Sequence, residues 1–272
     1  MSMTSWRLHP RNNAFEWRPR PDEGLKRLTP EQKRQFDEDG YTIVRGAFTA
    51  AEIAAVEAAI DPLEREHEAK LRANEKTNTI SSADAITFTG HIVKKSPVLK
   101  AFAAHPAIQE ICRDLIGDDV RLYWDQSVYK KTGRPQEFPW HQDNGYTYVE
   151  PQQYLTCWIP LVDVDVENGC PWIAPGMHKL GTLEHWRTET GLRCLDEASE
   201  AQPAEARRGD VIVFSSLAPH RTGPNLKAGT VRKAYILQYA PEGAEAVYPD
   251  DTRVALTDPD RQFFVLKEGQ PA

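Results

Sequence analysis

The sequence predicts an α+β fold in which helices come first and short strands follow. Residues 29–117 carry mainly helical patterns, and beyond Val120 the chain changes to short β-rich segments separated by Gly, Pro and Asn. This order favours helices that are segregated from an antiparallel sheet. A chain of 272 residues with 40% hydrophobic content can bury one substantial core, so we expect a single domain over residues 29–272.

The first 28 residues are rich in Arg, Pro and Asn and show no clear periodicity, which is typical of an extended arm. Trp6, Phe15 and Trp17 lie within this arm. Large aromatic side chains indicate that the arm packs on a surface, which is either its own domain or a neighbouring subunit.

Helix signals follow the arm in order. The segment 29–32 (TPEQ) is a capping box with Pro at the first helical position, and Gly40 ends this helix. Residues 41–44 are expected to form a short strand, and Thr49 caps a long amphipathic helix. A further single helix is expected over 98–115.

Five later segments are predicted to be strands, because they are short, rich in β-branched and aromatic residues, and bounded by turn residues. They are 120–130, 155–164, 171–174, 211–214 and 231–239. The segment 180–208 is long and polar and lacks a strand pattern. We expect it to be a lid over the mouth of a barrel, or else a solvated surface helix without a catalytic role.

Composition excludes several classes of partner. The formal charge of −7 argues against nucleic acid or an anionic membrane, which both require a basic face. The chain has no apolar run near the roughly twenty residues of a membrane span, and its start lacks the apolar core of a signal peptide. The four cysteines form no C-x-x-C pair and are expected to be reduced. These features predict a cytoplasmic protein, and its oligomeric state stays open.

Three residues have the chemistry and spacing of a metal site. His141 and Asp143 lie two positions apart on a strand-like segment, so their side chains point to the same side, and His220 comes from a distant strand. Two imidazoles and one carboxylate occupy one face of an octahedral Fe(II) and leave three positions for a chelating cosubstrate and O2. Short strands that end in metal ligands fit a double-stranded β-helix, a jelly-roll variant, over about residues 118–241.

Arg232 follows His220 on another strand-like segment. Its forked, permanently charged guanidinium suits the far carboxylate of 2-oxoglutarate better than a Lys would. The alternative is a surface Arg on an edge strand.

At these residues the chain resembles the phytanoyl-CoA dioxygenase family of Fe(II)- and 2-oxoglutarate-dependent oxygenases. The resemblance covers about residues 30–241 and includes DGYTIV at 39–44, WHQD at 140–143, ENGC at 167–170 and APGMH at 174–178, followed by His220, Asn225, Arg232 and Tyr239. One departure is Met177, because similar proteins usually carry Ser in Pro-Gly-Ser-His. This departure removes no ligand but affects the expected wall of the substrate pocket.

The resemblance implies a double-stranded β-helix core with flanking N-terminal helices. It also implies an enzyme that uses Fe(II), 2-oxoglutarate and O2, hydroxylates an aliphatic C–H bond of a small molecule, and releases succinate and CO2. Family positions near the cosubstrate fall on Thr222, Gln142 and Trp158, and less firmly on Tyr129 and Lys130.

The carboxylate of Asp143 favours hydroxylation over halogenation, because related halogenases carry a small residue there and bind chloride in the freed position. Desaturation, ring formation and epimerisation stay open, since the outcome depends on the pose of the substrate. A non-catalytic jelly-roll protein that binds a metal or a carboxylate ligand is a further alternative. Arg232 and Thr222 favour the enzyme, because a plain metal-binding barrel needs no dicarboxylate clamp.

Five residues that flank these motifs are candidates for the substrate pocket: Tyr146, Tyr148, Trp172, His178 and Arg221. His91 is a sixth candidate, because similar proteins often have a His at this place upstream of the barrel. An aromatic wall with an Arg and a His suits a substrate that has an apolar body and an acidic group. Neither the identity of the substrate nor a link to coenzyme A follows from these residues.

Overall fold

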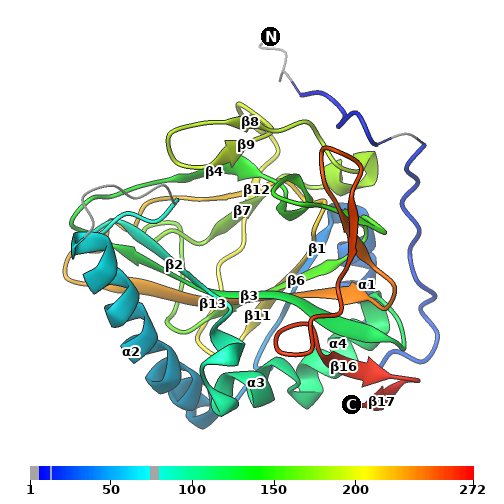
Figure 1. Ribbon diagram of the computed structural model, residues 1–272, viewed down its shortest axis with the longest axis horizontal. Helices are drawn as coiled ribbons and strands as arrows, with labels where there is room; N and C mark the ends of the chain where they lie inside the picture. Colours follow the sequence, from blue (N-terminus) through cyan, green and yellow to red (C-terminus); the bar gives the residue numbers. More distant parts are fainter. Residues whose placement is uncertain (1–5, 13, 74–79) are drawn as a thin grey trace.

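The computed structural model describes residues 6–12, 14–73 and 80–272. Its larger sheet is antiparallel and has the strand order β1-β11-β6-β13-β3-β16-β17, with β2 also paired to β3. These strands are β1 (Tyr41–Val44), β2 (Ile86–Gly90), β3 (Val120–Lys131), β6 (Leu155–Pro160), β11 (Val211–Ser215), β13 (Val231–Pro241), β16 (Phe264–Lys267) and β17 (Gln270–Pro271). The long central pair β3 and β13 runs across the middle of the molecule (Figure 1).

A smaller antiparallel sheet lies above the larger one in Figure 1 and has the order β10-β7-β12-β4. Its strands are β4 (Phe138–His141), β7 (Pro171–Ile173), β10 (Gln202–Pro203) and β12 (His220–Thr222). A third sheet joins β5 (Tyr148–Glu150), β14 (Glu245–Val247) and β15 (Arg253–Ala255). The predicted α+β class, with helices first and strands later, is confirmed.

Helices cover the outer face of the larger sheet. They are α1 (Pro30–Asp39), α2 (Ala50–Ala73), α3 (Pro97–Ala103) and α4 (Pro106–Leu115), and α2 and α3 lie below β3 and β13 in Figure 1. Alternate side chains of the strands, such as Cys157, Leu237 and Tyr239, pack with the helices in the main hydrophobic core. Because successive side chains of a strand point to opposite faces, the intervening residues face the smaller sheet. This alternation opens the space in which the site lies.

The helix prediction is correct at the first helix and wrong at the last. Thr29 accepts a hydrogen bond from the Gln32 backbone N–H, and Gly40 ends α1 in the left-handed conformation at φ 85°. The single helix expected over 98–115 is two helices, α3 and α4, that are separated before Pro106. Pro has no N–H and its ring disfavours helical geometry in the preceding residue, so His105 is extended and caps α4 instead.

The predicted strands agree with the structure within two residues, except that β6 ends at Pro160 rather than at residue 164. The segment 180–208 contains no surface helix beyond the short 3-10 turn η3 (Met177–Leu180), so that alternative is wrong. It forms a small hairpin of β8 (Trp186–Arg187) and β9 (Leu192–Arg193), then β10. The Cys194 N–H donates to the Trp140 carbonyl at 2.8 Å, which ties the segment to β4.

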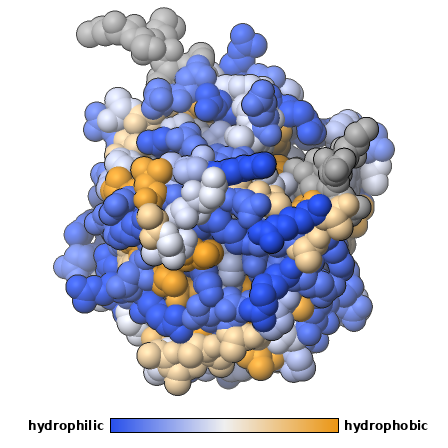
Figure 2. Space-filling model, turned by 90° about the vertical axis from the view of Figure 1, so that its left-hand side faces the viewer, coloured by the Kyte–Doolittle hydropathy of each residue, from blue (hydrophilic) through white to orange (hydrophobic). Residues whose placement is uncertain are grey.

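The N-terminal arm packs on its own chain. The His9 N–H donates to the Thr182 carbonyl at 3.0 Å, and Trp17 makes ring contacts with Phe36 and His178. The face drawn in Figure 2 is largely hydrophilic, with its apolar side chains in small groups. In the described part of the chain, no helix combines the length and apolarity that crossing a membrane requires.

Candidate metal centre and its cavity

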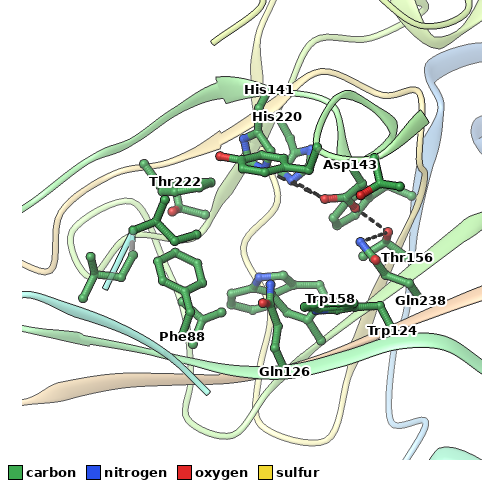
Figure 3. A pocket seen from close by; sticks show the side chains of 18 of the residues that line it. Phe88, Trp124, Gln126, His141, Asp143, Thr156, Trp158, His220, Thr222 and Gln238 are labelled. Carbon is green, nitrogen blue, oxygen red and sulfur yellow. Dashed lines mark hydrogen bonds and ion pairs between the residues drawn. The ribbon is translucent and has the colours of Figure 1, made fainter. Parts of the chain in front are cut away.

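His141, Asp143 and His220 meet at one point between the sheets. His141 ends β4 and lies directly opposite His220, the first residue of β12, while Asp143 begins the 3-10 turn η2 (Asp143–Gly145). The Nε2 atoms of both histidines lie 3.9 Å from Asp143 Oδ1, and the three ligand atoms are within 4.8 Å of one another. The predicted ligand set is therefore assembled in the structure (Figure 3).

The tautomers of both histidines are set by backbone carbonyls. His141 Nδ1 lies 2.8 Å from the Pro139 carbonyl, and His220 Nδ1 lies 3.0 Å from the Ala218 carbonyl. A carbonyl only accepts, so each Nδ1 carries the proton and each Nε2 presents a lone pair to the centre. Burial and the neighbouring His220 lower the pKa of His141 well below its ordinary value, which keeps that imidazole neutral.

Asp143 is oriented by a hydroxyl of the larger sheet. Thr156 Oγ1 donates to Asp143 Oδ2 at 2.5 Å, and Gln238 Nε2 donates to Thr156 Oγ1 at 3.4 Å (Figure 3). The second oxygen, Oδ1, is the one that faces both histidines. Two neutral nitrogen donors and one carboxylate oxygen fit Fe(II) with open positions.

The three candidate ligands line a cavity of about 290 Å³ between the two sheets. Its walls are rich in aromatic side chains and include Phe88, Tyr123, Trp124, Phe138, Tyr146 and Trp158. A concave, largely apolar cavity with a few polar groups is typical of a small-molecule site.

Arg232 is the one cation among the described residues that line this cavity. It is 1% exposed and lies on β13 between β3 and β6, so the alternative of a surface Arg on an edge strand is wrong. Nη1 donates to the Val128 carbonyl at 3.2 Å, whereas the buried Nε and Nη2 have no hydrogen-bond partner. Burial lowers the pKa of Arg232 to about 9. Unsatisfied buried donors are costly, so this guanidinium fits an anionic ligand that enters the cavity.

Two of the other predicted cosubstrate residues also line the cavity. They are Thr222 on β12 and Trp158 on β6, and the ring of Trp158 lies 5.2 Å from the Arg232 guanidinium. The structure therefore brings together Arg232, Thr222, Trp158 and the three candidate metal ligands.

Gln142 does not line the cavity. Its carboxamide donates to the carbonyls of Gly181 and Leu217 and accepts from the Leu183 N–H. It faces away because it lies between His141 and Asp143 in the chain, and alternate residues of an extended segment point to opposite sides. The Gln142 side chain therefore does not face the cosubstrate as expected, and instead it holds the start of the segment that follows residue 180 by hydrogen bonds.

Tyr129 and Lys130 do not line the cavity either. The Tyr129 hydroxyl donates to Asp61 on α2 at 2.6 Å, since Tyr129 belongs to the outer face of β3. Lys130 Nζ donates to the carbonyls of Gln136, Thr222 and Gly223. Burial and the nearby Arg232 lower the pKa of Lys130 well below its ordinary value. Its Nζ atom supports the turn after β12 rather than a cosubstrate.

Of the six substrate-pocket candidates, only Tyr146 lines the cavity. Tyr148 stacks on His9, and its hydroxyl donates to the Arg11 carbonyl. His178 packs against Trp17, and its Nε2 lies near the Asp37 carbonyl. These two residues hold the arm and α1 against the sheets.

The remaining candidates lie behind the cavity walls. Arg221 forms an ion pair with Glu137 at 2.6 Å, and its guanidinium lies 5.5 Å from the rings of both Trp140 and Trp172. His91 packs against the ring of Trp124 at 4.2 Å and does not line the cavity itself. A residue that lies close to a metal motif in the sequence need not line the cavity, because neighbouring side chains of a strand point to opposite faces.

Met177, the departure from the family pattern, packs against a buried cluster that includes Trp140, Ala174 and Leu183, and it does not line the cavity. The expected effect on the pocket wall is therefore not seen.

Sequence reasoning missed Phe88, Gln126, Thr156 and Gln238, which all line the cavity. The available signal was the alternation within strands: once Trp158 and Arg232 are taken to face inward, Thr156 and Gln238 follow at even spacings. The strand that carries Phe88 was not predicted.

The chain is similar to known proteins over most of its length. A model of the phytanoyl-CoA dioxygenase family (PhyH) matches residues 36–234. Phytanoyl-CoA dioxygenase domain-containing protein 1 of Rattus norvegicus is 24% identical over 258 residues, covering 76% of this chain and 88% of the relative. Ectoine dioxygenase of Bordetella bronchiseptica is 26% identical over 221 residues, covering 73% and 71%.

Among solved structures, the epimerase SnoN in complex with Fe3+, alpha ketoglutarate and nogalamycin RO superposes with a TM-score of 0.67. It is 20% identical in sequence, and the match covers 86% of this chain and 97% of SnoN. This likeness confirms the double-stranded β-helix fold.

A double-stranded β-helix that presents two histidines, an aspartate and a buried arginine to one cavity defines an oxygenase dependent on Fe(II) and 2-oxoglutarate. Within this class, the chain belongs to the phytanoyl-CoA dioxygenase family. Iron and 2-oxoglutarate are accordingly its cofactor and cosubstrate.

Proposed function

We propose that this oxygenase hydroxylates an aliphatic C–H bond of a small molecule and releases succinate and CO2. The observation that carries the proposal is the presence, in one cavity, of a carboxylate metal ligand and an arginine whose Nε and Nη2 lack partners. The carboxylate of Asp143 holds the ligand position that a halogenase leaves open for chloride.

The residues have separate roles in this proposal. His141, Asp143 and His220 hold the iron, and Arg232 with Thr222 holds the far carboxylate of 2-oxoglutarate. The bound iron and 2-oxoglutarate supply the oxidising power, from O2, that breaks the C–H bond. Thr156 keeps Asp143 Oδ1 directed at the metal, and the aromatic walls exclude water from the reacting atoms.

Epimerisation is the second candidate outcome, because the SnoN epimerase has a similar fold. The ectoine dioxygenase relative supports oxygenation of a small molecule. Both outcomes use the same residues, and only the fate of the substrate separates them.

Product analysis tests the proposal. Candidate small molecules are incubated with the enzyme, Fe(II), 2-oxoglutarate and ¹⁸O₂, and succinate and the substrate-derived product are analysed by mass spectrometry. Hydroxylation adds one labelled oxygen to the substrate. An unlabelled product with inverted stereochemistry supports epimerisation, and a complete lack of succinate supports the non-catalytic alternative.

A further inference from the structure

We propose that the substrate is electrically neutral where it enters the cavity, has an apolar body of about one or two rings, and is oriented by a hydrogen bond to the side chain of Gln126. This inference rests on the proposed function, because it concerns the part of the cavity that iron and 2-oxoglutarate leave free. It replaces the acidic substrate that Arg221 and His178 had indicated, since both lie outside the cavity.

The formal charges that line the cavity indicate a neutral substrate. Among its described lining residues, only Arg232 and Asp143 have a formal charge, and both are used by the cosubstrate and the metal. Fe(II) and Arg232 together balance Asp143 and the two carboxylates of 2-oxoglutarate, and the histidines bind as neutral ligands. A charged group of the substrate would therefore be buried without a partner, which is strongly unfavourable.

The walls give the shape and polarity of the occupant. Phe88, Phe138 and Tyr146 form a continuous row of aromatic rings, and Phe138 and Tyr146 both contact the ring of His141. Trp124 lies on the floor of the cavity, below His141 and His220 in Figure 3. A volume of about 290 Å³ that also accommodates 2-oxoglutarate leaves room for a small body only. Flat aromatic walls favour ring-containing or other compact apolar molecules.

Gln126 supplies the polar contact. It lies in the middle of β3, opposite Ile236, and in Figure 3 its side chain rises from the floor toward the side where His141 and His220 lie. Within the chain as described, its carboxamide makes no hydrogen bond, whereas the nearby Gln238 is bonded to Thr156. A carboxamide both donates and accepts, so it pairs with a carbonyl, an amide or a hydroxyl of a neutral ligand.

Three probes of one shape test the charge preference: 2-naphthamide, 2-naphthoate and 2-naphthylmethylammonium. The protein is loaded with Zn(II), which prevents turnover, and saturated with 2-oxoglutarate, which occupies Arg232. Binding of each probe is then measured by isothermal titration calorimetry. We expect 2-naphthamide to bind about 100-fold more tightly than either ion, because each ion loses its hydration without gaining a partner.

Variants test the role of Gln126. Gln126→Leu should weaken 2-naphthamide binding about five- to ten-fold and leave the affinity for 2-oxoglutarate unchanged. Gln270→Leu, which changes an exposed glutamine on β17, should alter neither. Gln126→Arg introduces a cation into the cavity and should reverse the preference in favour of 2-naphthoate.

The results separate this inference from the proposed function. The 2-oxoglutarate titration comes first, and a failure to bind it would overturn both. With 2-oxoglutarate bound, equal or tighter binding of either ion, or no binding of any probe, would overturn the neutral substrate alone. An unchanged affinity of Gln126→Leu for 2-naphthamide would show that Gln126 does not bind the substrate.

Discussion

Thr156 is a residue at which a single hydroxyl should control the affinity for the metal. Its Oγ1 donates to Asp143 Oδ2 at 2.5 Å, which fixes the orientation of the carboxylate. We expect Thr156→Val, which keeps the shape but removes the donor, to weaken metal binding about 10- to 100-fold. Competition with a fluorescent chelator measures the affinity. Thr156→Ser should restore most of it, and an affinity equal to that of the wild type in Thr156→Val would contradict the role.

Arg232 should act on the cosubstrate and not on the metal. Arg232→Gln removes the charged partner of a buried carboxylate, which should weaken 2-oxoglutarate binding by about 2–5 kcal/mol. Arg221→Gln is the matched control, because Arg221 lies outside the cavity in an ion pair with Glu137. Calorimetric titration of both variants checks this expectation. Equal losses in the two variants would show a general effect of charge or folding instead.

At the scale of the element, β3 carries a buried acid that should make stability depend on pH. Asp125 is fully buried, and burial raises its pKa to about 6. Hydrogen bonds from the Val93 N–H and the Tyr235 hydroxyl lower the pKa, but burial has the larger effect. The folded state thus holds the proton more tightly than the unfolded state, whose pKa is the ordinary 3.8. The free energy of unfolding should therefore fall by about 3 kcal/mol as pH rises from about 4 to 6.

Asp125→Asn isolates this contribution, because it removes the titration and retains an acceptor for the Val93 N–H. Urea unfolding of the variant and the wild type between pH 4 and pH 7 measures the difference. We expect the wild type to lose stability relative to the variant across this range. Parallel curves would mean that Asp125 titrates alike in both states.

The segment 180–208 remains our proposed lid. None of its residues lines the cavity, yet the Leu192 N–H on β9 donates to the hydroxyl of Tyr146, which does. Buried Leu183 and Leu195 anchor the segment on either side of the β8–β9 hairpin. We expect amide hydrogens of the hairpin to exchange rapidly in the iron-loaded enzyme and slowly once substrate binds. Full protection before substrate is added would make the hairpin part of the scaffold.

At the scale of the whole molecule, the sequence predicted what depends on local spacing. The capping box of α1 and the pairing of His141 with Asp143 need only the period of a helix or a strand. The place of Arg232 in the cavity was predictable because the proposed dicarboxylate clamp requires a forked cation on a strand near the metal site. Each of these features depends on a few residues that are close together in the sequence.

The rest depended on which face of each strand the helices cover. Tyr129 and Gln126 lie on one predicted strand, but only the packing of α2 shows that Tyr129 faces outward and Gln126 faces the cavity. Thr156 reaches Asp143 only because the two sheets face each other. Such contacts join segments that are distant in the sequence, so a local sequence pattern cannot predict them.

The central claim is that one cavity binds iron through His141, Asp143 and His220 and binds 2-oxoglutarate through Arg232. Anaerobic titration with Fe(II) and 2-oxoglutarate tests it most directly, because chelation of the iron by 2-oxoglutarate produces a metal-to-ligand charge-transfer absorption band. We expect the band only when both are present, saturating at one iron per chain. It should be lost in His220→Ala and require much more 2-oxoglutarate in Arg232→Gln. A wild-type protein that binds iron but shows no band at saturating 2-oxoglutarate would contradict the claim.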